Sequence, residues 1–178
     1  MGISKKIRQK WANMRFKSKG VAMGEGSRID GTVDISIPKN VALGKNSILY
    51  KQTCIYPSGQ GRFSMGSHSH IAPFGYLLID KNAITIGDHV AIGPYCSMIC
   101  HSNAIEGEAQ YFADNYLDAD IVIGSNVFIG AQCTILPGTI IGDNVVIAAN
   151  SVVRGNLQPN FVYGGSPVKK IKPIDAEA

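Results

Sequence analysis

Aliphatic residues recur at every sixth position between Ile123 and Val153, and this spacing constrains the fold of the chain more than any other feature. The series is Ile123, Ile129, Ile135, Ile141, Ile147 and Val153, with a small residue four positions after most members, such as Cys133 or Ser151. A period of six fits neither an amphipathic helix nor an alternating strand. It predicts a chain that turns a corner every six residues, with three inward-facing sides forming one coil of a parallel β-helix.

The same spacing extends toward the N-terminus. Four further sets of three residues follow it: Met23, Ile29 and Ile35; Leu43, Leu49 and Ile55; Met65, Ile71 and Leu77; Ile86, Ile92 and Met98. The residue after the first member of each set is always Gly, which marks one particular corner. We therefore predict an all-β domain of about six triangular coils over residues 21–158.

The two ends of the chain differ from this domain. Residues 1–20 predict a short basic amphipathic helix over 3–18, because apolar residues recur there at three- and four-residue steps: Ile3, Ile7, Trp11 and Met14. We expect its apolar side to cover the open end of the β-helix core, with peripheral contact to a membrane surface as the alternative. Residues 159–178 predict a C-terminal tail that begins with an exposed turn over 162–167 and continues into three lysines.

Composition sets limits on the class of protein. A chain of 178 residues can build one domain with a sizeable core. The net charge of +4 comes largely from the two ends, which we interpret as solvated termini without a nucleic-acid partner. We expect no membrane span, since no run of 18 apolar residues occurs, and no secretory signal in the charged first 20 residues. Four cysteines without a CxxC pair indicate a reduced, cytoplasmic protein.

One insertion interrupts the repeat far more than the others. Residues 102–120 follow His101, are acidic and aromatic, and show no period. Long loops on compact scaffolds are usually functional. His68 and His89 occupy a corner position that Asn fills in other coils, and His101 falls on a comparable corner position. The neighbouring loop nevertheless singles out His101 as a candidate general base, because a neutral imidazole can take a proton from a hydroxyl group.

Four blocks of the sequence, residues 86–94, 123–131, 137–153 and 164–171, resemble the hexapeptide-repeat acyltransferases, and within them the small sugar O-acetyltransferases. The resemblance covers about residues 65–175. It implies a left-handed parallel β-helix, a homotrimer with active sites between subunits, and acetyl-CoA as the acyl donor. No metal is expected.

The resemblance also implies roles for individual residues. His101 would be the catalytic base. The pantetheine arm of CoA would run along Gly130, Ala131, Ala148 and Ala149, and the CoA phosphates would meet Arg154, Lys169 and Lys172. Acceptor-binding candidates are Asn103, Tyr111 and Tyr116; Asn103 stands where the maltose and galactoside enzymes carry their histidine. The acidic partner of His101 stays open among Glu106, Glu108, Asp114 and Asp118.

The expected function is transfer of acetyl from acetyl-CoA to a hydroxyl of a sugar or glycan precursor. N-acetylation of an amino sugar, free or linked to a nucleotide, is an alternative, since the same base serves both reactions. A carbonic anhydrase-like zinc protein needs three converging histidines, and two of the four present here fit corner positions. A purely structural β-helix needs neither the loop after His101 nor the lysine-rich tail.

Overall fold

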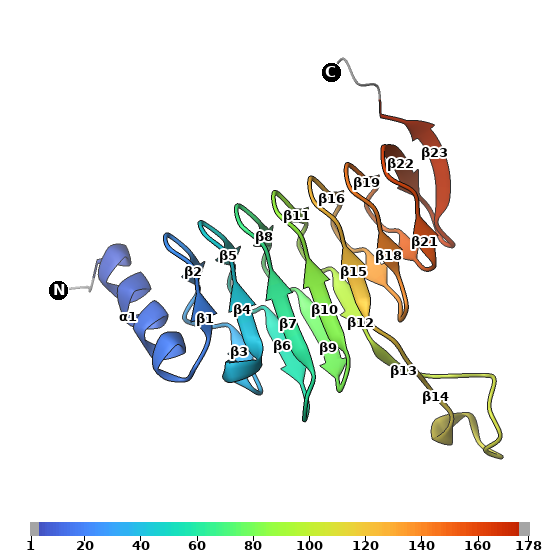
Figure 1. Cartoon of the computed structure of the whole chain (residues 1–178), viewed down its shortest axis with the longest axis horizontal. Helices are drawn as coiled ribbons and strands as arrows, with labels where there is room; N and C mark the ends of the chain where they lie inside the picture. The colour runs from blue at the N-terminus through green and yellow to red at the C-terminus, as the bar shows by residue number, and fades with distance from the viewer. Residues whose placement is uncertain (1–3, 175–178) are drawn as a thin grey trace.

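The computed structural model describes residues 4–174, which form a left-handed parallel β-helix of about six coils with one helix at its N-terminal end (Figure 1). Each coil adds one strand to each of three parallel sheets, named A, B and C here. This handedness departs from the rule for most parallel β connections.

The strands of the sheets are short and follow one another in chain order. Sheet A contains β1 (Ala22–Met23), β4 (Val41–Leu43), β7 (Arg62–Met65), β10 (Ala83–Ile86), β15 (Ile121–Ile123), β18 (Ile140–Ile141) and β21 (Asn156–Leu157). Sheet B contains β2 (Arg28–Ile29), β5 (Ile48–Leu49), β8 (His70–Ile71), β11 (Ala91–Ile92), β16 (Phe128–Ile129), β19 (Val146–Ile147), β22 (Phe161–Gly164) and β23 (Lys169–Pro173). Sheet C contains β3 (Asp34–Ile35), β6 (Cys54–Pro57), β9 (Tyr76–Asp80), β12 (Ser97–Ile99), β17 (Thr134–Ile135) and β20 (Val152–Val153).

The predicted aliphatic positions stack in register along the axis of the β-helix. Ile86 pairs with Met65 on one side and Ile123 on the other, and Met98 pairs likewise with Leu77 and Ile135 in sheet C. These side chains are buried, as are the small residues of the repeat. Buried hydroxyls are satisfied locally: Thr139 donates to the Leu136 carbonyl at 2.7 Å. The period of six therefore predicted most of the inward positions correctly, with Met23 and Ile35 only partly buried.

The corner between sheets A and B confirms the interpretation of His68 and His89 as scaffold residues. Five residues at this corner have φ between 54° and 57°: Asn46, His68, His89, Asn126 and Asn144. Asn and His tolerate this left-handed conformation better than most residues. The His68 and His89 rings stack with their centroids 5.0 Å apart, so that these two histidines form part of one ladder of corner side chains.

Helix α1 (Lys5–Ser18) covers the N-terminal end of the β-helix, but not with the predicted face. Ala12 and Phe16 are buried, whereas Ile7, Trp11 and Met14 are exposed; Ile3 lies outside the described residues. Polar side chains explain the orientation. The Asn13 amide accepts from the Ile29 backbone N–H at 3.1 Å and donates to the Ser27 carbonyl at 3.1 Å. Gln9 donates to the Ile29 carbonyl at 2.8 Å. The helix thus satisfies backbone groups of the first coil that no earlier coil can reach.

The C-terminal end also differs from the prediction. The exposed turn expected over 162–167 is wrong for its first part, since β22 pairs in parallel with β19 and Tyr163 is buried. The chain turns only at 165–168, and β23 then returns antiparallel along β22. Within residues 4–174, no helix has the length and apolar character needed to cross a bilayer.

Adjacent residues of β18 test the alternation of inward and outward side chains. Ile141 is 1% exposed and Ile140 is 47% exposed. We expect Ile141→Ala to lower the free energy of unfolding by about 2–5 kcal/mol, because it leaves a cavity in the core. The matched change Ile140→Ala should cost less than about 1 kcal/mol. Urea denaturation of both variants checks this, and equal losses would contradict the assigned faces.

Candidate active site

The predicted loop leaves the β-helix at the corner between sheets C and A. One coil earlier, Asp80 turns this corner with a φ of 50°. His101 instead begins β13 (His101–Asn103), which pairs antiparallel with β14 (Tyr116–Asp118) in a hairpin that protrudes from the side of the β-helix (Figure 1). His101 therefore lies at this corner in a strand of the hairpin, and it is not among the residues that turn a corner with a positive φ.

The hairpin places a carboxylate beside His101. Nδ1 of His101 lies 2.9 Å from Oδ1 of Asp118, its register partner in β14, and 3.9 Å from Oδ2 of Asp80. The His101 side chain is 30% exposed and that of Asp118 is 22% exposed. An ionised carboxylate only accepts hydrogen bonds, so that in the neutral ring Nδ1 carries the proton and Nε2 keeps a free lone pair.

Several groups keep Asp118 ionised. The hydrogen bond from His101 and the Lys81 ammonium, 3.1 Å from Oδ2, lower the pKa of Asp118 to about 2. The Asn82 amide also donates to Oδ1, at 3.2 Å. Four acidic residues were candidates for the partner of His101, and the structure shows Asp118 hydrogen-bonded to it. Glu106, Glu108 and Asp114 are exposed elsewhere in the loop.

The three predicted acceptor-binding residues make different contacts in the structure. The Tyr116 ring stacks on His101, with centroids 4.8 Å apart and planes 17° apart. Asn103 uses its amide to hold the loop, donating to the carbonyl of Ala113 at 3.0 Å. Tyr111 is 63% exposed at the loop surface. Among the three, Tyr116 is the one in ring contact with the candidate base.

The predicted CoA-binding residues lie on other parts of the β-helix. Ala131, Ala148 and Ala149 lie at the corner between sheets B and C, across sheet C from His101. Gly130 is buried there, and a side chain would meet the Ala149 backbone nitrogen at 2.5 Å, so that its role in the fold is close stacking of coils. The three cations are exposed; Arg154 follows β20, and Lys169 and Lys172 lie in β23. One chain does not bring all these residues together around His101.

Three potential metal ligands lie close together at this corner. Asp80, His101 and Asp118 each offer a ligand atom, and these atoms lie within 4.8 Å of one another. The Lys81 ammonium already supplies positive charge to Asp118. Within residues 4–174 of one chain, His68 and His89 stack at the corner between sheets A and B, His70 lies in sheet B, and only His101 lies at this corner.

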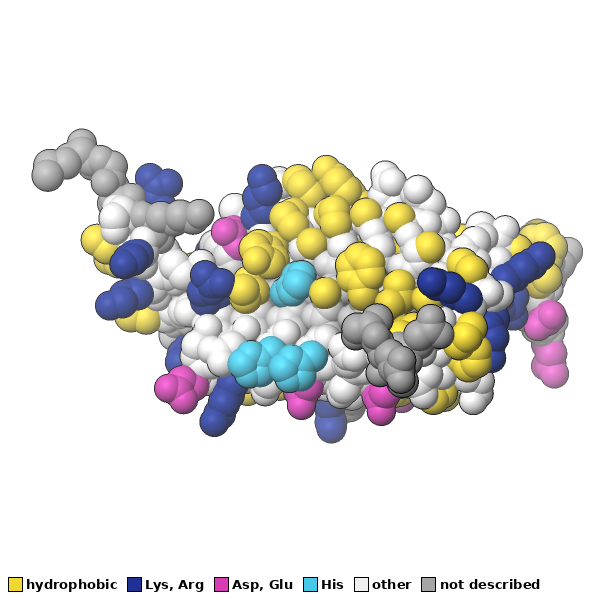
Figure 2. Space-filling model, turned by 90° about the horizontal axis from the view of Figure 1, so that it is seen from above, with side chains coloured by type: hydrophobic (Ala, Val, Ile, Leu, Met, Phe, Trp, Pro, Cys, Tyr) yellow, Lys and Arg dark blue, Asp and Glu magenta, His cyan; other side chains and the backbone are white. Residues whose placement is uncertain are grey.

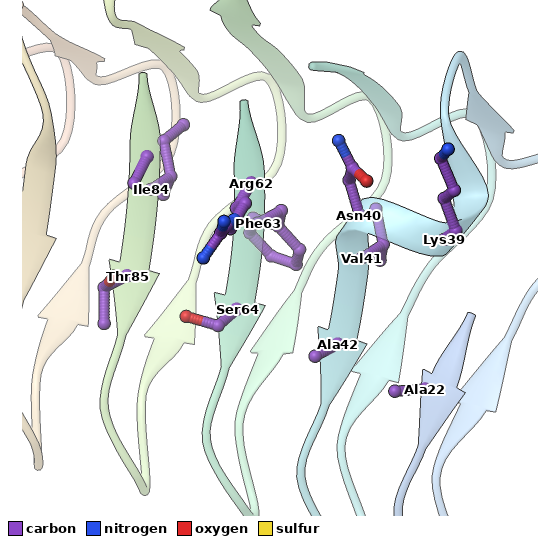
Figure 3. A pocket seen from close by; sticks show the side chains of 11 residues that line it. Ala22, Lys39, Asn40, Val41, Ala42, Arg62, Phe63, Ser64, Ile84 and Thr85 are labelled. Carbon is purple, nitrogen blue, oxygen red and sulfur yellow. The ribbon is translucent and has the colours of Figure 1, made fainter. Parts of the chain in front are cut away.

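A groove of about 410 Å³ begins next to this cluster, on the outer face of sheet A. Arg62, Ser64 and Thr85 project into it from neighbouring strands, and Lys39 closes its far end (Figure 3). Lys39 belongs to the short helix η1 (Pro38–Asn40) just before β4. Ala83, which also lines the groove, directly follows the Asn82 that bonds Asp118. None of the residues that line the groove is acidic.

Sequence reasoning missed Asp80, Lys81, Asn82 and Arg62, although one signal was available. Asp80 stands three residues after Leu77, as His101 stands three residues after Met98, and Leu77 and Met98 are register partners. Equal phase in consecutive coils therefore predicts that these residues share one corner. No such equal spacing predicts the position of Arg62. Its pairing with Ala83 depends on the longer corner that precedes β7.

Comparison with known proteins gives a family match. The profile described as bacterial transferase hexapeptide (six repeats) matches residues 120–155. The probable macrolide acetyltransferase of Lysinibacillus sphaericus is 53% identical, over 54% of this chain and 67% of that protein. The galactoside O-acetyltransferase of Escherichia coli K12 is 37% identical over 118 residues, which are 64% of this chain and 58% of the relative. This chain thus spans less than two thirds of the length of that enzyme.

Solved structures agree over nearly the whole chain. A single-residue mutant of AntD, an N-acyltransferase from Bacillus cereus determined in complex with dTDP and coenzyme A, superposes with a TM-score of 0.83 at 25% identity. The alignment covers 92% of this chain and 90% of AntD. The similarity includes the coils on both sides of the protruding hairpin.

The contact between His101 and Asp118 predicts the tautomer of the imidazole. In the neutral ring we expect the proton on Nδ1, because Asp118 can only accept a hydrogen bond. Nitrogen-15 NMR of the His101 side chain measures this directly. Asp118→Ala should move the proton toward Nε2, and Asp114→Ala, a loop carboxylate without this contact, should leave it unchanged. A native ring protonated on Nε2 would contradict the assignment.

Proposed function

Because this chain belongs to the hexapeptide-repeat acyltransferase family, we propose that it transfers an acetyl group from acetyl-CoA to a hydroxyl of a sugar or glycan precursor. The observation that carries this proposal is the His101–Asp118 pair at the base of the protruding hairpin. The similarity to a galactoside O-acetyltransferase supports a sugar acceptor.

His101 acts as the general base in this reaction. Nε2, which is not used by Asp118, takes the proton from the acceptor hydroxyl as its oxygen attacks the thioester carbon of acetyl-CoA. The new ester bond forms as the carbon–sulfur bond breaks, and the imidazolium returns its proton to the departing thiolate. His101 alone therefore both accepts the proton from the hydroxyl and returns it to the thiolate.

Asp118 and Tyr116 position this base. The negative charge of Asp118 stabilises the imidazolium that forms during the transfer and fixes the orientation of the ring. The Tyr116 ring covers one face of His101 and limits its rotation; it also attracts the ring in its charged form. Lys81 and Asn82 hold Asp118 from the other side.

CoA binding involves more than one chain in this proposal. Ala131, Ala148 and Ala149 leave room for the pantetheine arm, and Arg154, Lys169 and Lys172 are free to meet phosphates. The three alanines lie across sheet C from His101, Arg154 lies at the same edge as His101 but in a later coil, and the two lysines lie in β23. A CoA molecule therefore reaches both the alanines and His101 most directly between neighbouring subunits of a homotrimer. Hydrophobic side chains on the face that carries sheet B support an interface there (Figure 2).

The cysteines support a reducing compartment. Cys54, Cys96, Cys100 and Cys133 are all free thiols, as in most proteins of the cytoplasm, where acetyl-CoA is also made available to enzymes. We therefore assign the reaction to the cytoplasm.

Removal of the imidazole tests the proposal. We expect His101→Ala to lower the rate of acetyl transfer by at least about 100-fold, because the general base is lost, while CoA still binds. The measurement is thiol release from acetyl-CoA with a panel of sugars and amino sugars. His68→Ala, which removes a histidine at another corner, is the control and should retain activity. Unchanged turnover in His101→Ala would exclude His101 from the mechanism.

The groove on sheet A favours a second candidate acceptor, a sugar linked to a nucleoside diphosphate. Arg62 lies one strand from Ala83, and Lys39 lies beside the strand after that. At the usual strand spacing the two cations are up to roughly 10 Å from Ala83, which directly follows the Asn82 that bonds Asp118. A hexose at His101 would direct its diphosphate along this groove. The binding of dTDP by AntD, which is similar over the whole β-helix, supports such an acceptor.

A charge-removal variant separates the two acceptor classes. Arg62→Ala should raise the KM for a nucleotide-linked sugar by about tenfold or more, because a charge-assisted hydrogen bond to phosphate is lost. The KM for acetyl-CoA should not change. Lys45→Ala, which removes an exposed cation outside the groove, is the control. An equal effect of Arg62→Ala on neutral sugars would contradict a phosphate site in the groove.

A further inference from the structure

Helix α1 has two opposite faces, and one of them has no partner within the described chain. Its inner face packs on the first coil through Ala12 and Phe16. Its outer face carries Ile7, Trp11 and Met14, which are 48%, 70% and 58% exposed. These three positions follow the i, i+4, i+7 spacing of one helical stripe. The most exposed large apolar side chains of the helix are thus aligned and turned away from the core.

Cations flank this apolar stripe on both sides. At 100° per residue, Arg8 and Arg15 lie along one side of it, and Lys6, Lys10 and Lys17 lie along the other. Residues 4–20 contain no Asp or Glu. Among residues 4–174, the described ion pairs all lie at the His101 corner, and none involves these five cations. Their charge is not neutralised within the described structure.

The position of α1 leaves the stripe accessible. The helix lies across the N-terminal end of the β-helix, at the opposite end from β22 and β23, and the hairpin of His101 projects from the side (Figure 1). Lys, Arg and hydrophobic side chains alternate on the surface of this end (Figure 2). Copies that pack side by side along the β-helix would leave the end face uncovered.

We propose that this face of α1 docks the protein on the surface of an anionic lipid bilayer. A Trp, an Ile and a Met enter the boundary between headgroups and acyl chains, and the flanking Lys and Arg side chains bind lipid phosphates. Charge complementarity favours this occupant over the others. A second copy would bring the same cations together, and a nucleic acid would leave the three apolar side chains exposed to water. The docking goes beyond the acetyl transfer proposed above and does not depend on it.

The chain contains its own reporter, since Trp11 is its single tryptophan. The full-length protein is mixed with vesicles of phosphatidylcholine alone or with added phosphatidylglycerol. With phosphatidylglycerol we expect a blue shift of the tryptophan emission and co-sedimentation with the vesicles. Both signals should weaken as salt rises, and both should be absent with phosphatidylcholine alone.

Two sets of variants separate the apolar and the ionic contributions. Ile7→Ser with Met14→Ser keeps the reporter and should lower partitioning by about tenfold or more, because two apolar anchors are lost. Arg8→Gln with Lys10→Gln should lower it by about fivefold for each cation. Ile171→Ser is the matched control: Ile171 is 59% exposed among Lys169, Lys170 and Lys172 at the other end, and its loss should leave partitioning unchanged. Thermal melts should be the same for all these exposed-face variants and the native protein.

Three results would overturn the proposal. One is the absence of a spectral shift with phosphatidylglycerol vesicles in a folded protein. Another is a blue shift that grows with protein concentration in the absence of lipid, which would mean that a second copy covers the stripe. The third is equal vesicle binding by the native protein and the Ile7/Met14 double variant, which would mean that the cations alone account for binding to the vesicles. Acetyl transfer is measured separately, so that its failure and a failure of docking are distinguishable.

Discussion

The structure depends on the hydrogen bonds that each coil exchanges with the coils before and after it. Short strands of two to five residues cannot form a stable sheet alone, but every strand inside the stack has two neighbours in register. Gly44, for example, donates its backbone N–H to the Met65 carbonyl at 2.7 Å, and Gly24 donates to Leu43 at 2.8 Å. This register forces equivalent residues of successive coils into columns, which is why one period in the sequence fixes both the core and the corners.

The same arrangement explains how the site arises. A coil can lengthen only at a corner, because an added residue inside a strand would reverse the direction of every later side chain. The long insertion therefore leaves at the corner between sheets C and A, and its return strand brings Asp118 opposite His101. Asp80 reaches the same point from the preceding coil. The candidate base thus lies on a strand of the hairpin, and the irregular loop extends beyond Asn103.

The two ends of the stack are closed by different means, and each closure gives the protein a surface property. At the N-terminal end, Gln9 and Asn13 satisfy the first coil, which turns Trp11 and its cationic neighbours outward. At the C-terminal end, β23 folds back along β22 and presents its lysines. The end with α1 faces along the axis of the β-helix, so that the docking proposed there would leave the His101 corner uncovered on the side.

The sequence by itself determined the β-helix, the number of coils and most of the inward residues, because these follow from a repeat whose register is fixed by local spacing. It also singled out His101 as a candidate base, through the long insertion that follows it. It did not determine which face of α1 packs inward, since the contacts of Asn13 and Gln9 with the first coil outweigh the apolar spacing of Ile7, Trp11 and Met14. It also left four acidic residues open as the partner of His101. Only the antiparallel pairing of β13 with β14 decided for Asp118, because the register of a hairpin closed by a long irregular loop cannot be read from spacing alone.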